Sequence, residues 1–72
     1  MPHLIRVEPL AEGWAVRHGD TENPQVFISG AKAETAAMSL GARLAGAGDA
    51  AEVQIILRDG SVAGRFVCRA AA

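Results

Sequence analysis

The last third of the chain limits the possible folds most, because it contains two β-prone runs, VQIIL and SVAGRFV, on either side of Asp59-Gly60. A two-residue Asp-Gly loop favours a type I′ turn, since both residues accept positive φ. This turn would pair residues in the order Arg58 with Ser61, Leu57 with Val62, Ile56 with Ala63, Ile55 with Gly64, Gln54 with Arg65 and Val53 with Phe66. A slip by one residue would mix the two faces, so the pattern and the turn both predict an antiparallel hairpin over residues 53–67.

Three shorter runs in the first 30 residues also indicate strands. Residues 4–8 alternate, so that Ile5 and Val7 share one face, and Pro9 ends the run. Residues 13–18 alternate again, with Trp14, Val16 and His18 on one face. Residues 18–24 are dense in turn formers and are predicted to be a loop.

The third strand is predicted over residues 25–29, QVFIS, which is short and rich in β-branched residues. Its core face could be Val26 with Ile28, or Phe27 alone. We expect Val26 and Ile28 to be buried, because this choice buries two β-branched side chains.

From Ser29 onward the period changes to three and four residues, which indicates a helix with Ser29 as N-cap and with Gly46 and Gly48 at its end. Its expected core stripe contains Ala33, Ala36, Ala37, Leu40, Gly41 and Leu44. The predicted fold class is therefore α+β, in the order β-β-β-α-β-β. A single mostly antiparallel sheet would carry the helix on one face. We expect one domain over residues 1–72, with a loosely held tail at about 69–72.

Composition and charge exclude several function classes. The formal net charge of −1 gives no global electrostatic reason to bind nucleic acid. The single cysteine, Cys68, excludes an intrachain disulfide and suits a reducing compartment. No leader-like N-terminus or membrane-length apolar run is present, so we expect a cytoplasmic protein that does not bind membranes.

Catalytic and cofactor motifs are absent from the sequence. It has no glycine-rich phosphate loop, no nucleophile elbow and no cysteine pair. His3, His18 and Cys68 are the only soft or borderline metal-ligand candidates, and their spacing does not place them in a cluster. We expect Trp14 to be a core residue and His18 a solvated one. The expectation is therefore no catalytic residue, no cofactor and no metal.

Two surfaces could bind a partner. The first is the face of the sheet away from the helix, where the strand assignments place Arg6, Arg17, Phe27, Ile56, Arg58 and Arg65 against Glu8 and Glu52. Arginines around an exposed aromatic ring could bind single-stranded nucleic acid. The alternative, which we favour, is an ordinary polar outer face on which arginine stems cover apolar groups.

The second surface is the helix flank, where Met38, Ala42 and Ala45 are candidate dimer contacts. Ala33, Ala37, Gly41 and Ala45 also recur at every fourth residue. Such a row of small residues lets another backbone approach closely, either the sheet of the same chain or a second helix. Alanine is also simply a good helix former. The core is small, because alanine supplies fifteen residues and aromatics only three, so dimerisation would add useful burial.

Three short motifs stand out in the chain: Gly13-Trp14-Ala15-Val16, Lys32-Ala33-Glu34 at the helix start, and Arg58-Asp59-Gly60 in the late hairpin. Together they resemble a small bacterial family known as domain of unknown function 2188. The chain departs from the family pattern at Glu12, in a longer helix and in the helix entry SGAK. The strand order is also similar to that of HicB-type antitoxin domains, which is a likeness of fold alone.

The resemblance implies no established activity, so the functional prediction comes from the residues. We predict a non-enzymatic binding or assembly module that forms a homodimer through the helix flank or a sheet edge. The first alternative is a nucleic-acid-binding domain that uses the arginine face. The second is antitoxin-like binding of another protein.

Overall fold

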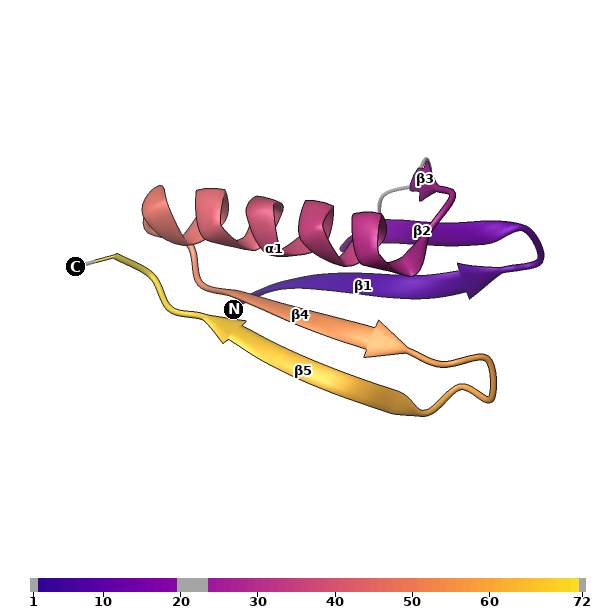
Figure 1. Cartoon of the computed structure of the whole chain (residues 1–72). Helices are drawn as coiled ribbons and strands as arrows, with labels where there is room; N and C mark the ends of the chain where they lie inside the picture. The colour runs from indigo at the N-terminus through magenta and orange to yellow at the C-terminus, as the bar shows by residue number, and fades with distance from the viewer. Residues whose placement is uncertain (1, 20–23, 72) are drawn as a thin grey trace.

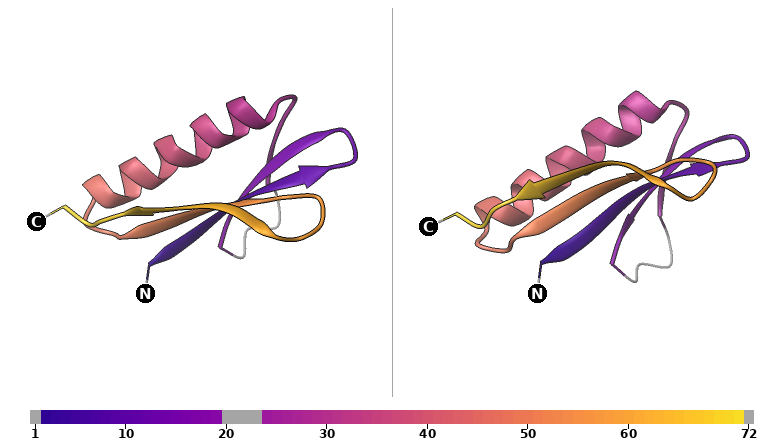
Figure 2. Two further views of the ribbon diagram at one scale, coloured as in Figure 1. Left: turned by 60° about the horizontal axis from the view of Figure 1, so that its bottom comes forward. Right: turned by 90° about the horizontal axis from the view of Figure 1, so that it is seen from below.

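The computed structural model describes residues 2–19 and 24–71, which form one five-stranded sheet with one helix on one face (Figures 1 and 2). The elements are β1 (His3–Leu10), β2 (Gly13–His18), β3 (Gln25–Phe27), α1 (Gly30–Gly46), β4 (Ala51–Ile56) and β5 (Val62–Cys68). The strand order across the sheet is β3-β2-β1-β4-β5. Among neighbouring strands only β1 and β4 run parallel, because α1 carries the chain from β3 at one edge across the sheet to β4 on the other side of β1. The predicted α+β class and order of elements are confirmed.

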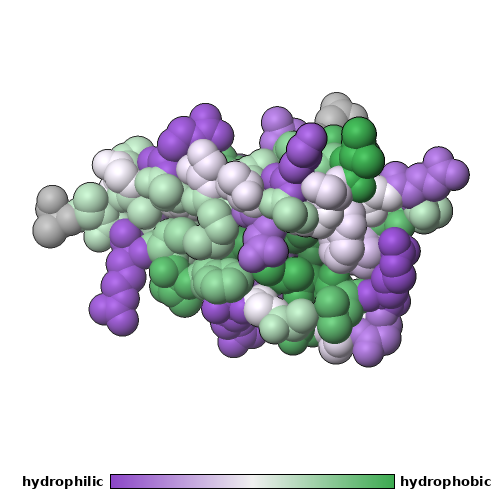
Figure 3. Space-filling model, in the orientation of Figure 1, coloured by the Kyte–Doolittle hydropathy of each residue, from purple (hydrophilic) through white to green (hydrophobic). Residues whose placement is uncertain are grey.

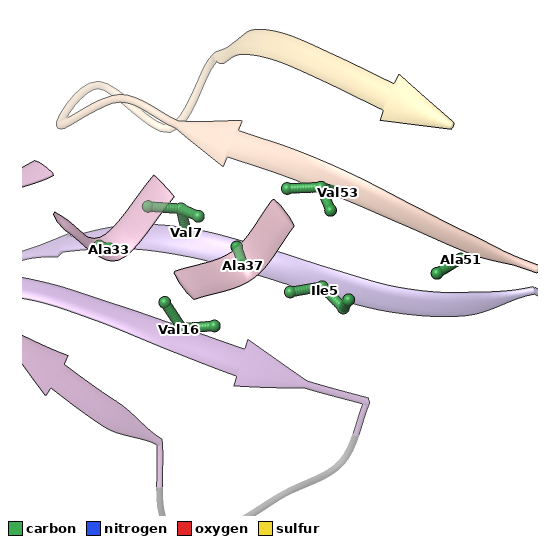
Figure 4. Close-up of a cluster of buried hydrophobic side chains, with 7 residues drawn as sticks. All are labelled: Ile5, Val7, Val16, Ala33, Ala37, Ala51 and Val53. Atoms are coloured by element: carbon green, nitrogen blue, oxygen red, sulfur yellow. The ribbon is translucent and has the colours of Figure 1, made fainter. Parts of the chain in front are cut away.

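The core lies between α1 and the three middle strands (Figure 4). The sheet contributes Ile5, Val7, Val16, Ala51 and Val53, and the helix contributes Ala33 and Ala37. Ile5, Val7 and Val53 are the largest side chains that are fully buried. The predicted alternation in residues 4–8 and 13–18 is therefore confirmed, and Trp14 packs against this core as expected. The predicted end of the first strand at Pro9 is wrong, because β1 continues to Leu10 and Pro9 is opposite Trp14.

Small residues let α1 lie close to the sheet. Ala33, Ala37, Gly41 and Ala45 are the buried residues of the helix. A Cβ atom added to Gly41 would lie 2.9 Å from Cys68 Sγ, which leaves no room for a side chain. Of the two expected uses of this row, approach to the sheet of the same chain is the one observed.

The predicted core face of the third strand is wrong. Val26 is 62% exposed and Ile28 is 90% exposed, whereas Phe27 packs against the core. Phe27 stands directly opposite Trp14 on β2, so the two aromatic residues share the helix side of the sheet. On this side Phe27 forms a cross-strand aromatic pair with Trp14, and such pairs stabilise a sheet beyond the apolar area that they bury. The strand also ends at Phe27, and Ile28 lies on the path to the helix.

The late hairpin has the predicted register in its body but not at its tip. Val53 is opposite Phe66, Gln54 is opposite Arg65, and Ile55 is opposite Gly64, as predicted. A bulge between Ile55 and Ile56 then shifts the register, so that Ile56 is opposite Val62. The predicted pairs Ile56 with Ala63, Leu57 with Val62 and Arg58 with Ser61 are therefore wrong.

The turn has a three-residue loop rather than a type I′ pair. Gly60 has a φ of +88°, and no non-glycine residue in the described chain has positive φ. Leu57 N–H donates to Ser61 O at 2.8 Å, and Gly60 N–H donates to Leu57 O at 2.9 Å. The Asp59 carboxylate accepts from both the amide and the hydroxyl of Ser61, which lowers the pKa of Asp59. These bonds hold Asp59 in a conformation that a type I′ turn does not allow.

The ends of α1 follow the sequence signals. The Ser29 hydroxyl accepts a hydrogen bond from Lys32 N–H at 3.1 Å, as expected of an N-cap. The helix ends at Gly46, and Ala71 N–H donates to Ala45 O at 2.9 Å. Within the described ranges, no helix is long and apolar enough to cross a membrane.

Candidate functional site

Three arginines form a row across the face of the sheet that α1 does not cover. Arg17 is opposite Arg6, Arg6 is opposite Gln54, and Gln54 is opposite Arg65. Side chains that are directly opposite on neighbouring strands lie about 4.5–5.5 Å apart at their Cβ atoms, so this row would repel itself without counter-charges.

Two glutamates on the same face supply those counter-charges. Glu8 accepts a hydrogen bond from Arg17 Nε at 2.8 Å and lies 3.4 Å from Arg6 Nη1. Glu52 lies 3.5 Å from Arg65 Nε and accepts a hydrogen bond from Gln54. Each of the three guanidinium groups is thus already paired with a carboxylate. This arrangement favours the ordinary polar outer face over a phosphate-binding surface.

Of the other three members of the predicted binding face, only Ile56 lies on the same face of the sheet as the arginines. Ile56 is partly buried and, by alternation from buried Val53, belongs to the face with the arginines. Arg58 is in the hairpin turn, where its Nη1 donates to Leu10 O at 2.9 Å. Phe27 is on the helix side, so its assignment to the outer face is wrong. Without an exposed aromatic ring, this face lacks the stacking platform that single-stranded nucleic acid uses.

The predicted helix flank is not a continuous exposed strip. Ala45 is buried as the last member of the small-residue row, because it follows Gly41 by four positions. Met38 is half-buried and packs against the core cluster. Ala42 is exposed, so only one of the three candidate dimer contacts is available in full.

Exposed apolar side chains gather instead along β5 and the turn before it. Phe66 is 41% exposed and Val67 is 64% exposed, and Leu57 and Val62 are exposed as well. Figure 3 shows apolar surface below α1, in the part of the view where Figure 1 draws β4 and β5. β5 is an edge strand of the sheet, and its only partner among the described residues is β4. The sequence predicts a sheet edge as a possible dimer contact, but it does not identify β5 as that edge.

A pair of histidines lies at the end of the sheet near the C-terminus of α1. His18 Nε2 lies 2.9 Å from His3 Nδ1 in a hydrogen bond, and the ring centroids are 4.9 Å apart. On its other side, His3 Nε2 lies 4.0 Å from Asp49 Oδ2. The expectation that His3 and His18 stay apart is wrong, and His18 is not simply a solvated side chain.

The hairpin register of β1 and β2 explains this pairing. His18 is opposite Ile5, and His3 precedes Ile5 by two residues, so the histidines are diagonal neighbours on one face. A two-residue connection at Ala11-Glu12 could have indicated this register, because Leu10 and Gly13 flank it as a pair. Cys68, the third ligand candidate, packs against the core near Gly41. Among residues 2–19 and 24–71, no group of three or more metal-ligating side chains occurs.

In comparisons with known proteins, no family model, no curated protein and no solved structure matches the chain. The resemblance to domain of unknown function 2188 and the likeness to HicB-type antitoxin domains therefore stay predictions.

Proposed function

We propose that this protein is a non-catalytic assembly module of the cytoplasm that forms a homodimer by pairing β5 with β5 of a second copy. The observation that carries this proposal is the exposed edge of β5, a strand of seven residues with apolar side chains along it. Proteins usually protect such an edge with charged side chains, above all lysine, with proline or with a bulge. β5 contains neither lysine nor proline, its one charged residue, Arg65, is paired with Glu52, and its bulge lies only at the Val62 end.

The strand is complementary to itself, which favours a second copy as the occupant. In antiparallel pairing across a two-fold axis beside Phe66, the two Phe66 side chains would face each other. Arg65 would then be opposite Val67 of the partner subunit, so like charges would not oppose each other. Backbone groups on the outer side of β5 would gain partners, and apolar side chains would leave water.

The other candidate surfaces support assembly less well. On the helix flank, Ala45 is buried in the core and Met38 is half-buried. The arginines of the outer face are paired with Glu8 and Glu52, so they offer little unpaired positive charge to phosphates or to an acidic protein partner. The edge of β5 is therefore the surface on which the proposal is based.

A lysine on β5 is expected to convert the dimer to a monomer. In Val67→Lys the new ammonium group would have to lie in the dimer interface, which raises the dimer Kd at least about tenfold, or roughly 1.4 kcal/mol. Sedimentation equilibrium over a range of protein concentrations measures the effect. Val26→Lys is a matched control, because Val26 is 62% exposed and stands on the opposite edge strand, β3.

The controls separate the alternatives. Val26→Lys and Ala42→Glu should remain dimeric, since neither position lies on β5. A wild-type chain that sediments as a monomer at high concentration would contradict the proposal. If only Ala42→Glu dissociates the dimer, the interface lies on the helix flank and not at β5. Oligonucleotide binding that weakens steeply with salt, and less steeply in Arg17→Ala, would favour the nucleic-acid alternative.

A further inference from the structure

The histidine pair at the end of β1 and β2 has a geometry that the assembly proposal does not use. We propose that His3 and His18 bind one divalent ion of a late transition metal, such as Zn²⁺, through His3 Nδ1 and His18 Nε2. Imidazole nitrogens suit zinc, nickel and copper, whereas Mg²⁺ and Ca²⁺ prefer oxygen ligands.

The separation of the two nitrogens fits a shared ion. They lie 2.9 Å apart. Two nitrogens that each lie about 2.0–2.1 Å from one ion, at an angle of roughly 90° to 110°, are about 2.9–3.4 Å apart. At the tetrahedral angle usual for zinc the two nitrogens would be about 3.3–3.4 Å apart, so the ion needs the rings to rotate until both lone pairs point at it and to separate by about 0.4 Å.

The backbone next to each histidine is already fixed. His3 N–H donates to Ala50 O at 2.8 Å, which holds the start of β1 against the segment before β4. Gly19 N–H donates to Leu4 O at 2.8 Å, which holds the chain directly after His18. A ligand pair on restrained backbone loses less conformational entropy when it binds an ion.

Asp49 is placed to support His3 as a ligand. Its Oδ2 lies 4.0 Å from His3 Nε2, the ring nitrogen that faces away from His18. Histidine ligands commonly donate their second N–H to a carboxylate, which fixes the tautomer and makes the ligating nitrogen more basic. At 4.0 Å the carboxylate lies beyond hydrogen-bond distance, so Asp49 would have to approach His3 Nε2 by about 1 Å to accept its N–H when the ion binds.

The protons balance without an additional reactant. In the neutral pair, one of the two facing nitrogens carries a proton and the other accepts it. Coordination requires a lone pair on both nitrogens, so that proton moves through solvent to the other nitrogen of the same ring. If the ring is His3, the proton arrives at Nε2, beside the Asp49 carboxylate. The two neutral imidazoles thus bind the ion without net proton release.

The site is open to solvent and has few ligands. The side chain of His3 is 39% exposed, so an ion can reach it. Two imidazoles leave the other coordination positions to water, so binding should be weaker than in a four-ligand structural zinc site. Binding should also raise the melting temperature, because the ion joins the ends of β1 and β2 in the folded state only.

Calorimetric titration of the untagged full-length chain with Zn²⁺ tests the proposal. The expected result is one ion per chain, and no binding of Mg²⁺. His3→Gln and His18→Gln should each weaken binding at least about tenfold, and Asp49→Asn by a smaller factor. Cys68→Ser is the control for the only thiol, and it should bind Zn²⁺ like the wild type.

A second readout does not depend on variants that might fold poorly. In the wild type, the imidazole ¹⁵N resonances of both His3 and His18 should shift when Zn²⁺ is added. The absence of Zn²⁺ binding would overturn the proposal. Binding that survives in both glutamine variants, or that disappears in Cys68→Ser, would overturn it as well, because the ion would then sit elsewhere.

Discussion

Gly13→Ala is expected to cost the domain at least about 3 kcal/mol of unfolding free energy, which is most of what a chain of this size has. Gly13 has a φ of +118°, a conformation that L side chains rarely adopt. A Cβ atom there would also lie 2.5 Å from Phe27 O. Because this neighbour is backbone, relief requires β3 to move away from β2, which would also separate Phe27 from Trp14.

Urea denaturation followed by circular dichroism measures this loss. Gly46→Ala is the matched control, since a Cβ there meets nothing within 4 Å and the residue ends a helix. Gly46→Ala should leave the stability unchanged or raise it by up to about 1 kcal/mol, because alanine favours the helix. A Gly13→Ala domain as stable as the wild type would contradict the described path of β2 and β3.

Ile5→Ala is expected to lower the unfolding free energy by about 2–5 kcal/mol. Ile5 is fully buried in β1, the central strand, between β2 and β4. Truncation to alanine removes apolar contacts and leaves a cavity under α1, which the rigid sheet cannot fill by collapse. In a domain with so small a core, this loss should leave a substantial unfolded population at room temperature.

The control for this variant is its neighbour in sequence. Leu4→Ala removes a side chain of equal size from the opposite face, where Leu4 is 38% exposed. Its cost should be smaller, about 1–2 kcal/mol, because more than a third of the Leu4 side chain already lies in water and its removal leaves no enclosed cavity. Thermal and chemical unfolding of both variants compare the two faces directly. A larger cost for Leu4→Ala than for Ile5→Ala would mean that the faces of β1 are reversed.

Alternation predicted the buried faces of the longer strands because a side chain in a strand has only two directions. Ile5, Val7, Val16 and Val53 therefore point under the helix as the sequence indicates. The buried face of β3 could not be predicted in this way, because three residues are too few to show alternation. Its burial depends on Trp14, a partner in another strand.

The turn of the late hairpin shows a different limit. Asp-Gly fits a type I′ turn, and it also fits a three-residue loop that ends in a glycine with positive φ. The contacts between Asp59 and Ser61 select the second, and the bulge at Ile55 and Ile56 then restores the predicted register. The Asp-Gly motif alone therefore does not distinguish the two turns, and the hydrogen bonds between Asp59 and Ser61 do.

The candidate sites depend on registers between strands, which the sequence reveals only in part. The arginine row was predicted for Arg6, Arg17 and Arg65, but their pairing with Glu8 and Glu52 needs the geometry of neighbouring strands. The histidine pair likewise joins residues fifteen positions apart. The position of β5 at the edge follows from the crossover that places β4 beside β1.

Amide hydrogen exchange along β5 tests the central claim most directly, because it reports whether the outer edge of this strand gains hydrogen-bond partners. The β5 amides that bond to no strand of the same chain should exchange slowly at high protein concentration and rapidly after dilution below the dimer Kd. The amides of β1, in the middle of the sheet, should show no such dependence. Exchange along β5 that is equally fast at all concentrations would contradict the account.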